Sequence, residues 1–234
     1  MSTDELVVAP EPGGAEARQA AAGERLAAEY ARMAHDFEPR PVDTVLRGLD
    51  VIGASVLLVV LAPVLGLCAL AVLVSGRPVL YRGARVGRAG SVFYMYKFRT
   101  LRPDAERRLG PYLGAELSRL TEAEMTRVGR ALRAAKLDEL PQLWNVLRGD
   151  MSLVGPRPIR PLFFEALCEE IPAYWQRLVV RPGVTGLAQL RLSREMTWAE
   201  KLVHDLEYIA DRSVSLYLSI LVQTLVFIAA RVRQ

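Results

Sequence analysis

The sequence predicts a mainly α-helical, membrane-associated protein with one small β-hairpin, and three observations support this class. In a chain of 234 residues, the stretch from Val51 to Ser75, VIGASVLLVVLAPVLGLCALAVLVS, carries no charge. The stretch from Ser213 to Ala230 is also uncharged. Between the two, helical periodicity of apolar residues dominates, with one β-prone pattern soon after the first stretch. A hydrophobic content of 51% and a mean hydropathy of +0.17 agree with this class.

Charge is distributed unevenly along the chain. The net charge of +4 combines an acidic N-terminal part with an arginine-rich middle over residues 77–160. Such an excess of positive charge attracts anionic partners. Residues 1–40 are predicted to be an acidic extension, partly disordered and partly helical. No signal peptide is expected, because the first apolar block begins only at Val51.

The uncharged stretch from Val51 to Ser75 is long enough to cross a bilayer as a helix. Pro63 lies in its middle, where a proline removes a helical hydrogen bond and favours a kink. Arginines flank the stretch on both sides, and basic flanks favour the cytoplasmic face. A kinked segment that enters and leaves on one face fits these flanks, and so does a simple span with its C-terminal end inside.

A β-hairpin is predicted directly after this stretch. Val79–Tyr81 and Phe93–Phe98 supply the β-prone residues, and Gly87 and Gly90 mark the turn region between them.

Helical patterns account for most of the remaining chain. They cover residues 103–135, 159–179 and 197–211, the second interrupted by Pro172 and the third amphipathic. The uncharged tail over 213–230 has a narrow polar stripe, so it could lie in a membrane interface, span the bilayer or pack on the domain; the interface is favoured. The chain thus divides into an N-terminal extension, a membrane helix, a catalytic domain and a C-terminal apolar helix, namely residues 1–40, 41–76, 77–212 and 213–234.

Asp138 and Glu139 are adjacent carboxylates in the segment KLDELPQLWNVLRGDMSLVGPRP, which ends with Arg157 between two prolines. A carboxylate can attack phosphorus to give an acyl phosphate, and a neighbouring one can hold Mg²⁺ against phosphate oxygens. A rigidly placed guanidinium suits a phosphoryl group. The alternative is local: Asp138 as a helix N-cap, Glu139 as a first-turn dipole partner and Pro141 as a first-turn proline. Composition alone favours the local interpretation of these residues.

The segment VRPGVTGLAQ, which ends at Gln189, is a second candidate site. Gly183 and Gly186 predict a tight turn that exposes backbone N–H groups beside Arg181, where an anion could bind. Plain loop geometry explains the glycines equally well.

Lys97 and Arg99 in the segment YKFRT lie at the end of the second hairpin strand. They would meet phosphates at the membrane surface, or they form the solvated face of a strand. His35 and His204 are single and far apart, with no metal-ligand spacing, so they are expected to be solvated surface residues.

Several motifs occur together in a specific order: RGLD, RVGRAGSVFYMYKFRTLRPDAE, KLDELPQLWNVLRGDMSLVGPRP, RPGVTGLAQ and YIADRS. In this order they resemble the bacterial sugar transferases, the monotopic polyprenyl-phosphate glycosyl-1-phosphate transferases that start exopolysaccharide, O-antigen or glycoprotein glycan assembly. The resemblance runs from about Arg47 to Ala230.

The resemblance implies a catalytic domain on the cytoplasmic face of the bacterial inner membrane, on a re-entrant helix kinked at Pro63. Asp138 would attack the β-phosphate of a UDP-sugar, release UMP and pass the sugar-phosphate to undecaprenyl phosphate. Glu139 would bind Mg²⁺, and Arg157 would position a phosphate. Further phosphate or nucleotide contacts are expected from Lys97, Arg99, Arg181, Gly183, Gly186 and Gln189. The implied partners are the two substrates and the lipid bilayer, with no nucleic acid and with a homodimer left open.

Two positions depart from the family pattern. Lys136 stands where a serine is common, and Tyr217 stands where an acid is common late in the C-terminal helix. A non-enzymatic alternative is a membrane-tethered basic module that binds anionic lipid or nucleic acid through residues 77–160. In that alternative the identities of Asp138 and Glu139 should not matter.

Overall fold

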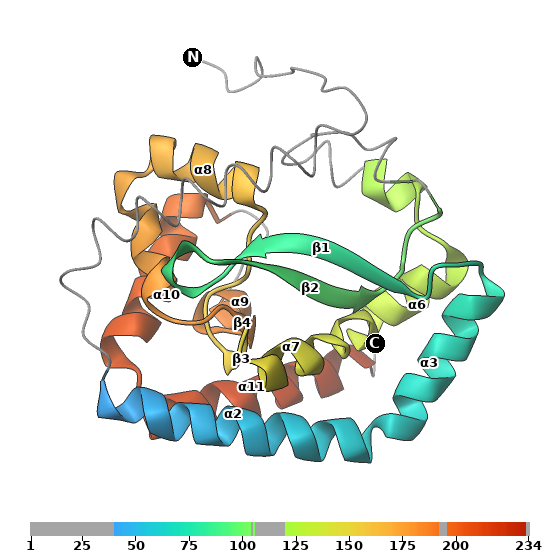
Figure 1. The fold of residues 1–234 in the computed structure, drawn as a ribbon, viewed down its shortest axis with the longest axis horizontal. Helices are drawn as coiled ribbons and strands as arrows, with labels where there is room; N and C mark the ends of the chain where they lie inside the picture. Colours follow the sequence, from blue (N-terminus) through green and yellow to red (C-terminus); the bar gives the residue numbers. More distant parts are fainter. Residues whose placement is uncertain (1–39, 104, 106–119, 192–195, 233–234) are drawn as a thin grey trace.

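The computed structural model describes residues 40–103, 105, 120–191 and 196–232. Helices α2 (Pro41–Val60) and α11 (Val214–Val232) run along one side of the molecule, with the hairpin and the shorter helices above them (Figure 1). The prediction of a mainly helical fold with one small antiparallel hairpin is confirmed. The helix expected in the N-terminal extension lies outside the described residues.

The bend predicted near Pro63 is confirmed. Helix α2 ends at Val60, α3 (Ala62–Val74) begins after Leu61, and the two helix axes differ by 64°. Pro63 lies in the first turn of α3, where its missing N–H costs least and where α2 could not continue. Within the described part of the chain, no helix taken alone has both the length and the apolar composition to cross a bilayer; the bent α2–α3 pair meets these limits only jointly.

The predicted hairpin is also confirmed, with a first strand longer than expected. Strands β1 (Leu80–Val86) and β2 (Val92–Phe98) pair antiparallel through their whole length. The connection contains the 3₁₀ turn η2 (Arg88–Gly90), in which Ala89 and Gly90 have φ of 56° and 73°. Left-handed residues of this kind give a hairpin turn the right twist.

One side chain continues the sheet beyond the hairpin. Asn145 in α7 (Gln142–Arg148) accepts a hydrogen bond from Tyr96 N at 3.0 Å and donates one to Tyr94 O at 2.8 Å. Its amide therefore satisfies the free edge of β2 as a neighbouring strand would, and this fixes α7 against the hairpin.

Two of the helical patterns are confirmed, whereas no pattern predicted a second pair of strands. The helix expected to break at Pro172 is α8 (Pro161–Glu170) followed by the 3₁₀ segment η4 (Pro172–Val179), and the amphipathic helix is α10 (Trp198–Asp211). Most of the 103–119 part of the first pattern lies outside the described residues. The elements not yet named are α6 (Arg127–Ala134), η3 (Leu137–Glu139), β3 (Ser152–Val154), β4 (Gly183–Thr185) and α9 (Leu187–Arg191). Strands β3 and β4 pair parallel.

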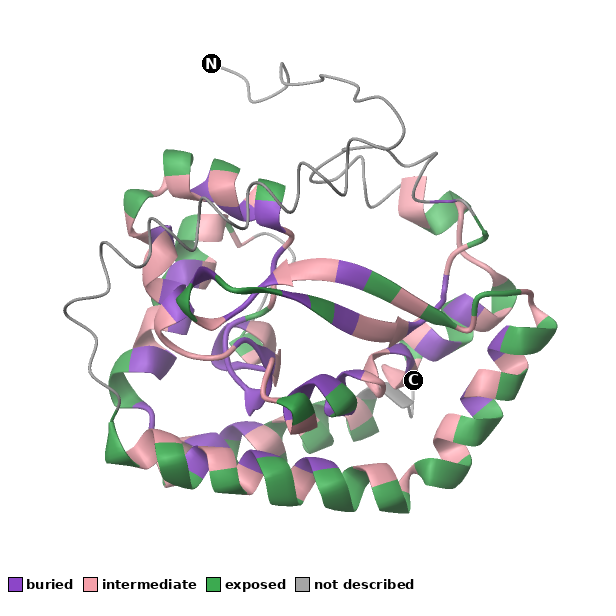
Figure 2. Ribbon diagram, viewed as in Figure 1, coloured by how far each residue is buried: buried purple, intermediate pink, exposed green. Residues whose placement is uncertain are grey.

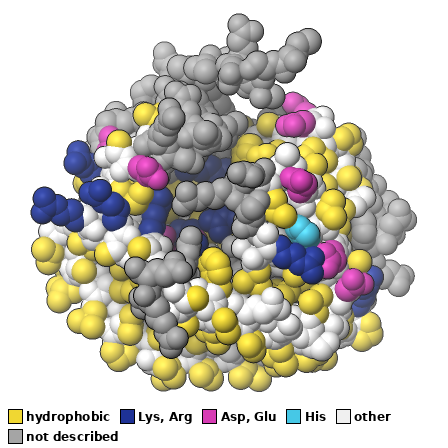
Figure 3. Space-filling model, turned by 180° about the vertical axis from the view of Figure 1, so that it is seen from behind, with side chains coloured by type: hydrophobic (Ala, Val, Ile, Leu, Met, Phe, Trp, Pro, Cys, Tyr) yellow, Lys and Arg dark blue, Asp and Glu magenta, His cyan; other side chains and the backbone are white. Residues whose placement is uncertain are grey.

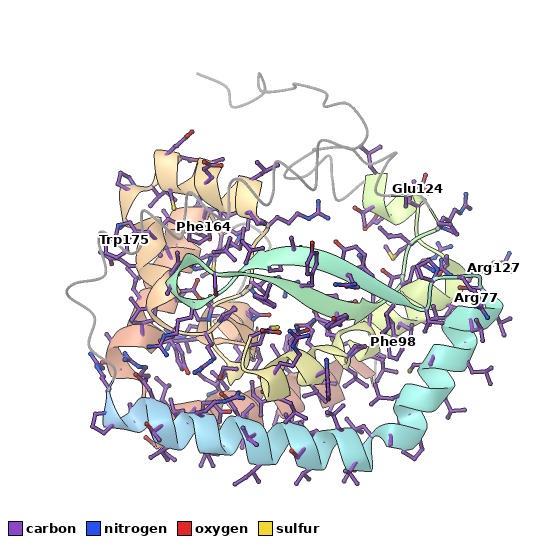
Figure 4. All side chains as sticks on the ribbon, in the orientation of Figure 1. Arg77, Phe98, Glu124, Arg127, Phe164 and Trp175 are labelled. Atoms are coloured by element: carbon purple, nitrogen blue, oxygen red, sulfur yellow. The ribbon has the colours of Figure 1, made fainter. Side chains whose placement is uncertain are left out.

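Three clusters of buried residues form the core. The largest joins α2, α7, β3 and α11, and a second lies among α8, η4 and α10 around Phe164 (Figure 4). The third joins α3, β2 and α6 around Phe98 (Figure 4). The bent helix pair is thus packed into the domain along most of its length rather than standing apart from it.

Of the three options left open for the tail, packing on the domain is observed. Tyr217 and Ile220 of α11 are completely buried, while the outward face of α11 is apolar and exposed. Helices α2 and α3 expose apolar side chains in the same way, so that a rim of hydrophobic side chains follows the lower side of the molecule (Figures 2 and 3). The most exposed members are Ile52, Val59, Val60, Leu67, Val74, Val222, Leu225 and Val226.

Candidate active site

Glu139 lies between cations from two distant segments. Its Oε1 accepts a hydrogen bond from Lys97 Nζ at 2.6 Å, and Nη2 of Arg157 lies 3.5 Å from the same oxygen. Arg157 in turn donates from Nη1 to Oε1 of Gln189 at 3.0 Å. The fold therefore brings four of the sequence-predicted site residues into one cluster, next to Asp138.

Asp138 differs from its neighbour. Its side chain is buried, with 6% of the residue exposed, yet its carboxylate makes no hydrogen bond or ion pair with any residue in the described ranges. A buried carboxylate that accepts no hydrogen bond keeps the lone pairs of its oxygens free to attack an electrophile. The two adjacent acids thus have opposite environments: one is fixed by cations, the other is left free.

The local backbone contradicts two parts of the structural interpretation of this segment, the N-cap role of Asp138 and the first-turn role of Pro141. Asp138 and Glu139 lie in the 3₁₀ turn η3, which follows Lys136 in a left-handed conformation with φ of 59°. Helix α7 starts only at Gln142, and its N-cap position is Pro141. Asp138 is therefore not a helix N-cap and Pro141 is not a first-turn proline, which corrects the local alternative.

The opposite environments shift the pKa values of the two carboxyls in opposite directions. Burial raises the pKa of Asp138 and the charge of Glu139 adds to this, while Lys97 opposes it. Burial acts the same way on Glu139, but Lys97 and other nearby cations outweigh it and lower the pKa of Glu139 to about 2. Two titratable groups whose pKa values are driven apart are typical of sites where each has its own chemical role.

Arg157 is positioned through its backbone. Gly155 N–H donates to Thr185 O at 2.8 Å, and Gly183 N–H donates to Pro156 O at 2.9 Å, so the loop is attached to β4. A Cβ at Gly183 would come within 2.1 Å of Gly155 N, and one at Gly186 within 2.2 Å of Gly155 O. The two loops therefore meet backbone to backbone, and only glycine fits at the contact.

This arrangement corrects the role expected for the two later glycines. The N–H of Gly183 is used inside the fold, in the hydrogen bond to Pro156, and is not presented to an anion. Gly183 and Gly186 serve the close approach of the loops. In the same segment, the buried Nε2 of Gln189 has no hydrogen-bond partner among the described residues. An unpaired amide donor beside a guanidinium is suited to a phosphate oxygen.

Arg99 is also placed elsewhere than expected. Its guanidinium donates to the carbonyl oxygens of Pro78 at 2.7 Å, Leu101 at 2.6 Å and Gly76 at 2.7 Å, with longer contacts to Ser75 and Val72. All its donors are directed to the chain around the C-terminal end of α3. Arg99 therefore fastens the exit of the bent helix pair to β2 and leaves no nitrogen for a phosphate, because it is 6% exposed.

Arg181 lies outside the cluster as well. Its Nε donates to Gly149 O at 2.8 Å, and its side chain lines a cavity against α2.

Sequence patterns missed three residues that support Arg157. Nη2 of Arg177 donates to Arg157 O at 3.0 Å, while its Nε lies 2.7 Å from Asp205 Oδ2 and its Nη1 donates to Tyr174 Oη at 3.0 Å. Arg177 and Asp205 are buried. These residues lie far apart in the sequence and form no motif, so only the fold reveals them.

The residues present fit a magnesium ion that arrives with its substrate. Across residues 40–103, 105, 120–191 and 196–232, no group of three or more His, Cys, Asp or Glu side chains could hold a metal ion. Mg²⁺ needs fewer ligands from the protein, because it keeps several waters and binds one or two carboxylates together with substrate phosphates. Glu139, whose pKa is lowered to about 2 by Lys97 and other nearby cations, is ionised at neutral pH and could serve as such a carboxylate.

A fixed ionised acid, a buried acid without partners and cations close to both are suited to phosphoryl chemistry. The family model for bacterial sugar transferases matches residues 42–231. The chain belongs to this family. It is accordingly an enzyme, a sugar transferase, which decides against the non-enzymatic basic module.

Named relatives agree with this assignment. The UDP-glucose:undecaprenyl-phosphate glucose-1-phosphate transferase of Caulobacter vibrioides is 44% identical over 189 residues, which cover 78% of this chain and 69% of that protein. The UDP-N-acetylgalactosamine-undecaprenyl-phosphate N-acetylgalactosaminephosphotransferase of Aeromonas hydrophila is 36% identical over 79% of this chain, but over only 43% of its own length. The exopolysaccharide production protein PSS of Rhizobium leguminosarum bv. phaseoli is 38% identical over 79% of this chain and 96% of that protein.

Proposed function

We propose that the protein transfers a sugar-1-phosphate from a UDP-sugar to undecaprenyl phosphate and releases UMP, at the start of polysaccharide or glycoconjugate assembly. The observation that carries the proposal is the contrast within the acid pair. Asp138 is buried and free of partners, whereas Glu139 is held by Lys97 at 2.6 Å. The Caulobacter vibrioides and Aeromonas hydrophila relatives act on undecaprenyl phosphate and a UDP-sugar, as their names state.

In the first step an Oδ atom of Asp138 attacks the β-phosphorus of the donor. The bond between that phosphorus and the oxygen of the α-phosphate breaks, UMP leaves with the electron pair, and an acyl phosphate joins the sugar-phosphate to Asp138. In the second step a phosphate oxygen of the acceptor attacks the same phosphorus. The bond to Asp138 breaks, the carboxylate is restored, and the product is a lipid-linked diphosphate sugar.

The other residues of the cluster orient the diphosphate. Arg157 and the free amide N–H of Gln189 donate to its oxygens, and Lys97 keeps Glu139 ionised and in place. Mg²⁺, when held by Glu139, would offset the charge of the diphosphate. Burial of Asp138 strengthens its nucleophilicity, because a carboxylate poorly solvated by water is more reactive.

The proposal includes a re-entrant docking on the cytoplasmic face of the bacterial inner membrane. The exposed apolar rim of α2, α3 and α11 is suited to the bilayer. Both ends of the bent pair are tied to the same domain. At the start of α2, Asp43 accepts from Arg212 at 2.6 Å and 3.1 Å; at the end of α3, Gly76 O accepts from Arg99 at 2.7 Å. A segment anchored at both ends to one domain favours entry and exit on one face.

The test uses the full chain in detergent or membranes with Mg²⁺, undecaprenyl phosphate and a panel of UDP-sugars that includes UDP-glucose and UDP-N-acetylgalactosamine. Release of UMP is followed for the wild type, for Asp138→Asn and in the presence of EDTA. We expect UMP from a donor of the panel, lost in the variant and with EDTA. Trapping the radiolabelled sugar-phosphate on the wild-type protein without acceptor tests the covalent step; an unlabelled but active enzyme would contradict it.

A further inference from the structure

A second basic site lies away from the acid pair, between the hairpin turn and the N-terminal half of α2. The structure has a cavity of about 40 Å³ there. Its charged lining consists of four arginines and two aspartates, which leaves two positive charges in excess: Asp43, Arg47, Asp50, Arg88, Arg181 and Arg212. None of these residues belongs to the cluster around Glu139. Arg88 and Lys97 lie toward opposite ends of the hairpin, and the strand between Val92 and Lys97 alone spans on the order of 17 Å.

Two of the arginines are not neutralised. Asp43 is bound by Arg212 at 2.6 Å, and Asp50 lies 3.9 Å from Arg47. By contrast, the side chain of Arg88 has no hydrogen bond or ion pair in the described part of the chain, and Arg181 uses only its Nε, toward Gly149 O. The terminal nitrogens of Arg181 and the whole guanidinium of Arg88 thus remain available at one cavity.

The guanidiniums at this cavity repel one another, although Asp43 and Asp50 offset part of the repulsion. Burial lowers the pKa of Arg181, and the charges of Arg47 and Arg88 lower it further, because like charges disfavour each other. A bound anion would remove this repulsion. Planar guanidiniums bind phosphate through paired hydrogen bonds, so their excess here selects an oxyanion rather than a cation or a neutral sugar.

The size of the cavity restricts the anion. Its volume of about 40 Å³ is roughly three times what one water molecule needs, which suits a single phosphate group and excludes a nucleobase or a hexose. The location suggests a source. On α2, Val45 and Ile52 are 53% and 64% exposed on the apolar rim, beside the cavity-lining Arg47. A lipid whose chains meet this rim would carry its phosphate to the level of the cavity.

We propose that this cavity binds one phosphate group, and that Arg88 and Arg181 are its principal donors. The site is separate from the acid pair and does not depend on the transfer reaction. A phosphate held by Arg88 and Arg181 would fill the space between the hairpin turn and α2, whose Arg47 lines the same cavity while its guanidinium donates to Val146 O and Leu147 O.

Hydrogen–deuterium exchange of the full chain in neutral detergent tests the proposal locally. Inorganic phosphate is titrated against chloride at equal ionic strength, and exchange is read in peptides that cover residues 86–91 and 43–50. We expect phosphate to slow exchange in both. Arg88→Gln should raise the phosphate concentration for half effect at least about tenfold, because one charge-assisted donor pair is lost. This variant should fold normally, since the Arg88 side chain has no partner to lose among the described residues.

Arg130→Gln is the matched control, because Arg130 on α6 is an exposed arginine and the change in net charge is the same. In this variant, phosphate should slow hydrogen exchange at the same concentrations as in the wild type. Equal titrations of Arg88→Gln and the wild type, or no phosphate-specific slowing in either peptide, would overturn the proposal.

Nanodiscs separate the two sources of phosphate. If a membrane lipid is the occupant, phosphatidylglycerol discs already protect both peptides in the wild type but not in Arg88→Gln, and added inorganic phosphate changes nothing. If soluble phosphate is the occupant, protection appears only on its addition, in phosphatidylglycerol and in phosphate-free galactolipid discs alike. Equal hydrogen exchange in both peptides under all these conditions would also overturn the proposal.

Discussion

Asp50 and Asp138 are both deeply buried, with 2% and 6% of each residue exposed, yet their surroundings are opposites. Oδ1 of Asp50 accepts hydrogen bonds from Ser152 Oγ, Leu153 N and Tyr217 Oη at 2.7–2.8 Å. Asp138 has no such donor among the described residues. Asp50 therefore fastens α2 to β3 and α11, while Asp138 contributes nothing comparable to the fold.

This contrast separates the structural role of Asp50 from the chemical role proposed for Asp138. A carboxylate saturated with donors is stabilised in its charged form and is a poor nucleophile; one buried without donors is destabilised and reactive. The comparison also assigns a role to Tyr217, the position where relatives of this chain were expected to carry an acid. Here its hydroxyl completes the donor set of Asp50.

The largest expected effect is on turnover. Asp138→Asn should reduce UMP release by about three orders of magnitude or more, because the attacking oxygen is lost. Asp50→Asn, the matched change at the saturated site, should retain turnover within about tenfold wherever the protein remains folded. Similar losses of UMP release in both variants, at equal amounts of folded protein, would contradict different roles for Asp138 and Asp50.

The next effect is on stability, and here the larger loss is expected at Asp50 rather than at Asp138. Asp50→Ala should lower the free energy of unfolding by about 3 kcal/mol, because three buried donors lose their acceptor. For a chain of this size that corresponds to a melting temperature lower by about 6–12 °C. Asp50→Asn keeps one acceptor oxygen and should lose less. Thermal unfolding in detergent measures both, and an unchanged melting temperature for Asp50→Ala would contradict the structural role.

Lys97→Met should move the pH dependence of turnover. Lys97 lowers the pKa of both Asp138 and Glu139, so its removal raises both, and the acidic limb of kcat/KM should shift to higher pH. Lys97→Arg retains the charge and should keep the limb near its original position. A limb that stays in place in Lys97→Met would show that Lys97 does not set the acidity of the pair.

Stability should also depend on pH through Glu139. The folded pKa of about 2 lies below the ordinary 4.5, so this carboxyl stabilises the wild type fully above about pH 4.5 and loses that contribution as pH falls toward 2. Urea unfolding of the wild type and Lys97→Met between pH 3 and 6 should show a smaller pH slope in the variant. Identical slopes would argue against the ion pair.

A smaller effect sharpens the comparison at Asp138 itself. The raised pKa of Asp138 means that the folded protein binds this proton more tightly than the unfolded chain, so ionisation at neutral pH costs stability. Asp138→Asn should therefore be more stable than the wild type by about 1 kcal/mol, a gain typical of substituted active-site groups. A lower melting temperature for this variant would show that Asp138 has a structural role after all.

The smallest effect concerns the third donor of Asp50. Tyr217→Phe removes one buried hydrogen bond of 2.7 Å and should cost about 1 kcal/mol, with turnover unchanged. A neutral result would mean that Ser152 and Leu153 alone satisfy Asp50.

Much of this could be predicted from local patterns. The uncharged stretches, Pro63 and the turn glycines determined the bent pair, the hairpin and the tail helix, because each feature constrains a few neighbouring residues. The sequence could also name the acid pair and Arg157 as site candidates, since they lie in one continuous segment. Arg99 and Gly183 were assigned incorrectly: a phosphate-binding arginine and a helix-fastening one look alike in sequence, as do a ligand-facing glycine and a packed one.

Residues that act across the fold could not be predicted. The support of Arg157 by Arg177 and Asp205, and the saturation of Asp50 by Tyr217, depend on contacts between segments far apart in the chain. Nothing in the local pattern specifies which distant polar groups will meet, because that depends on the packing of whole helices.

The glycine contact between the loops of Arg157 and β4 bears on how sugar preference can diverge. Gly155, Gly183 and Gly186 meet through main-chain atoms, so no side chain takes part in setting the distance between the two loops. The loop that carries Arg157 is consequently positioned by main-chain contacts that no side-chain substitution alters directly. Under the proposed function, the preference for one sugar can therefore change by substitution around the sugar while Arg157 stays in place for the diphosphate.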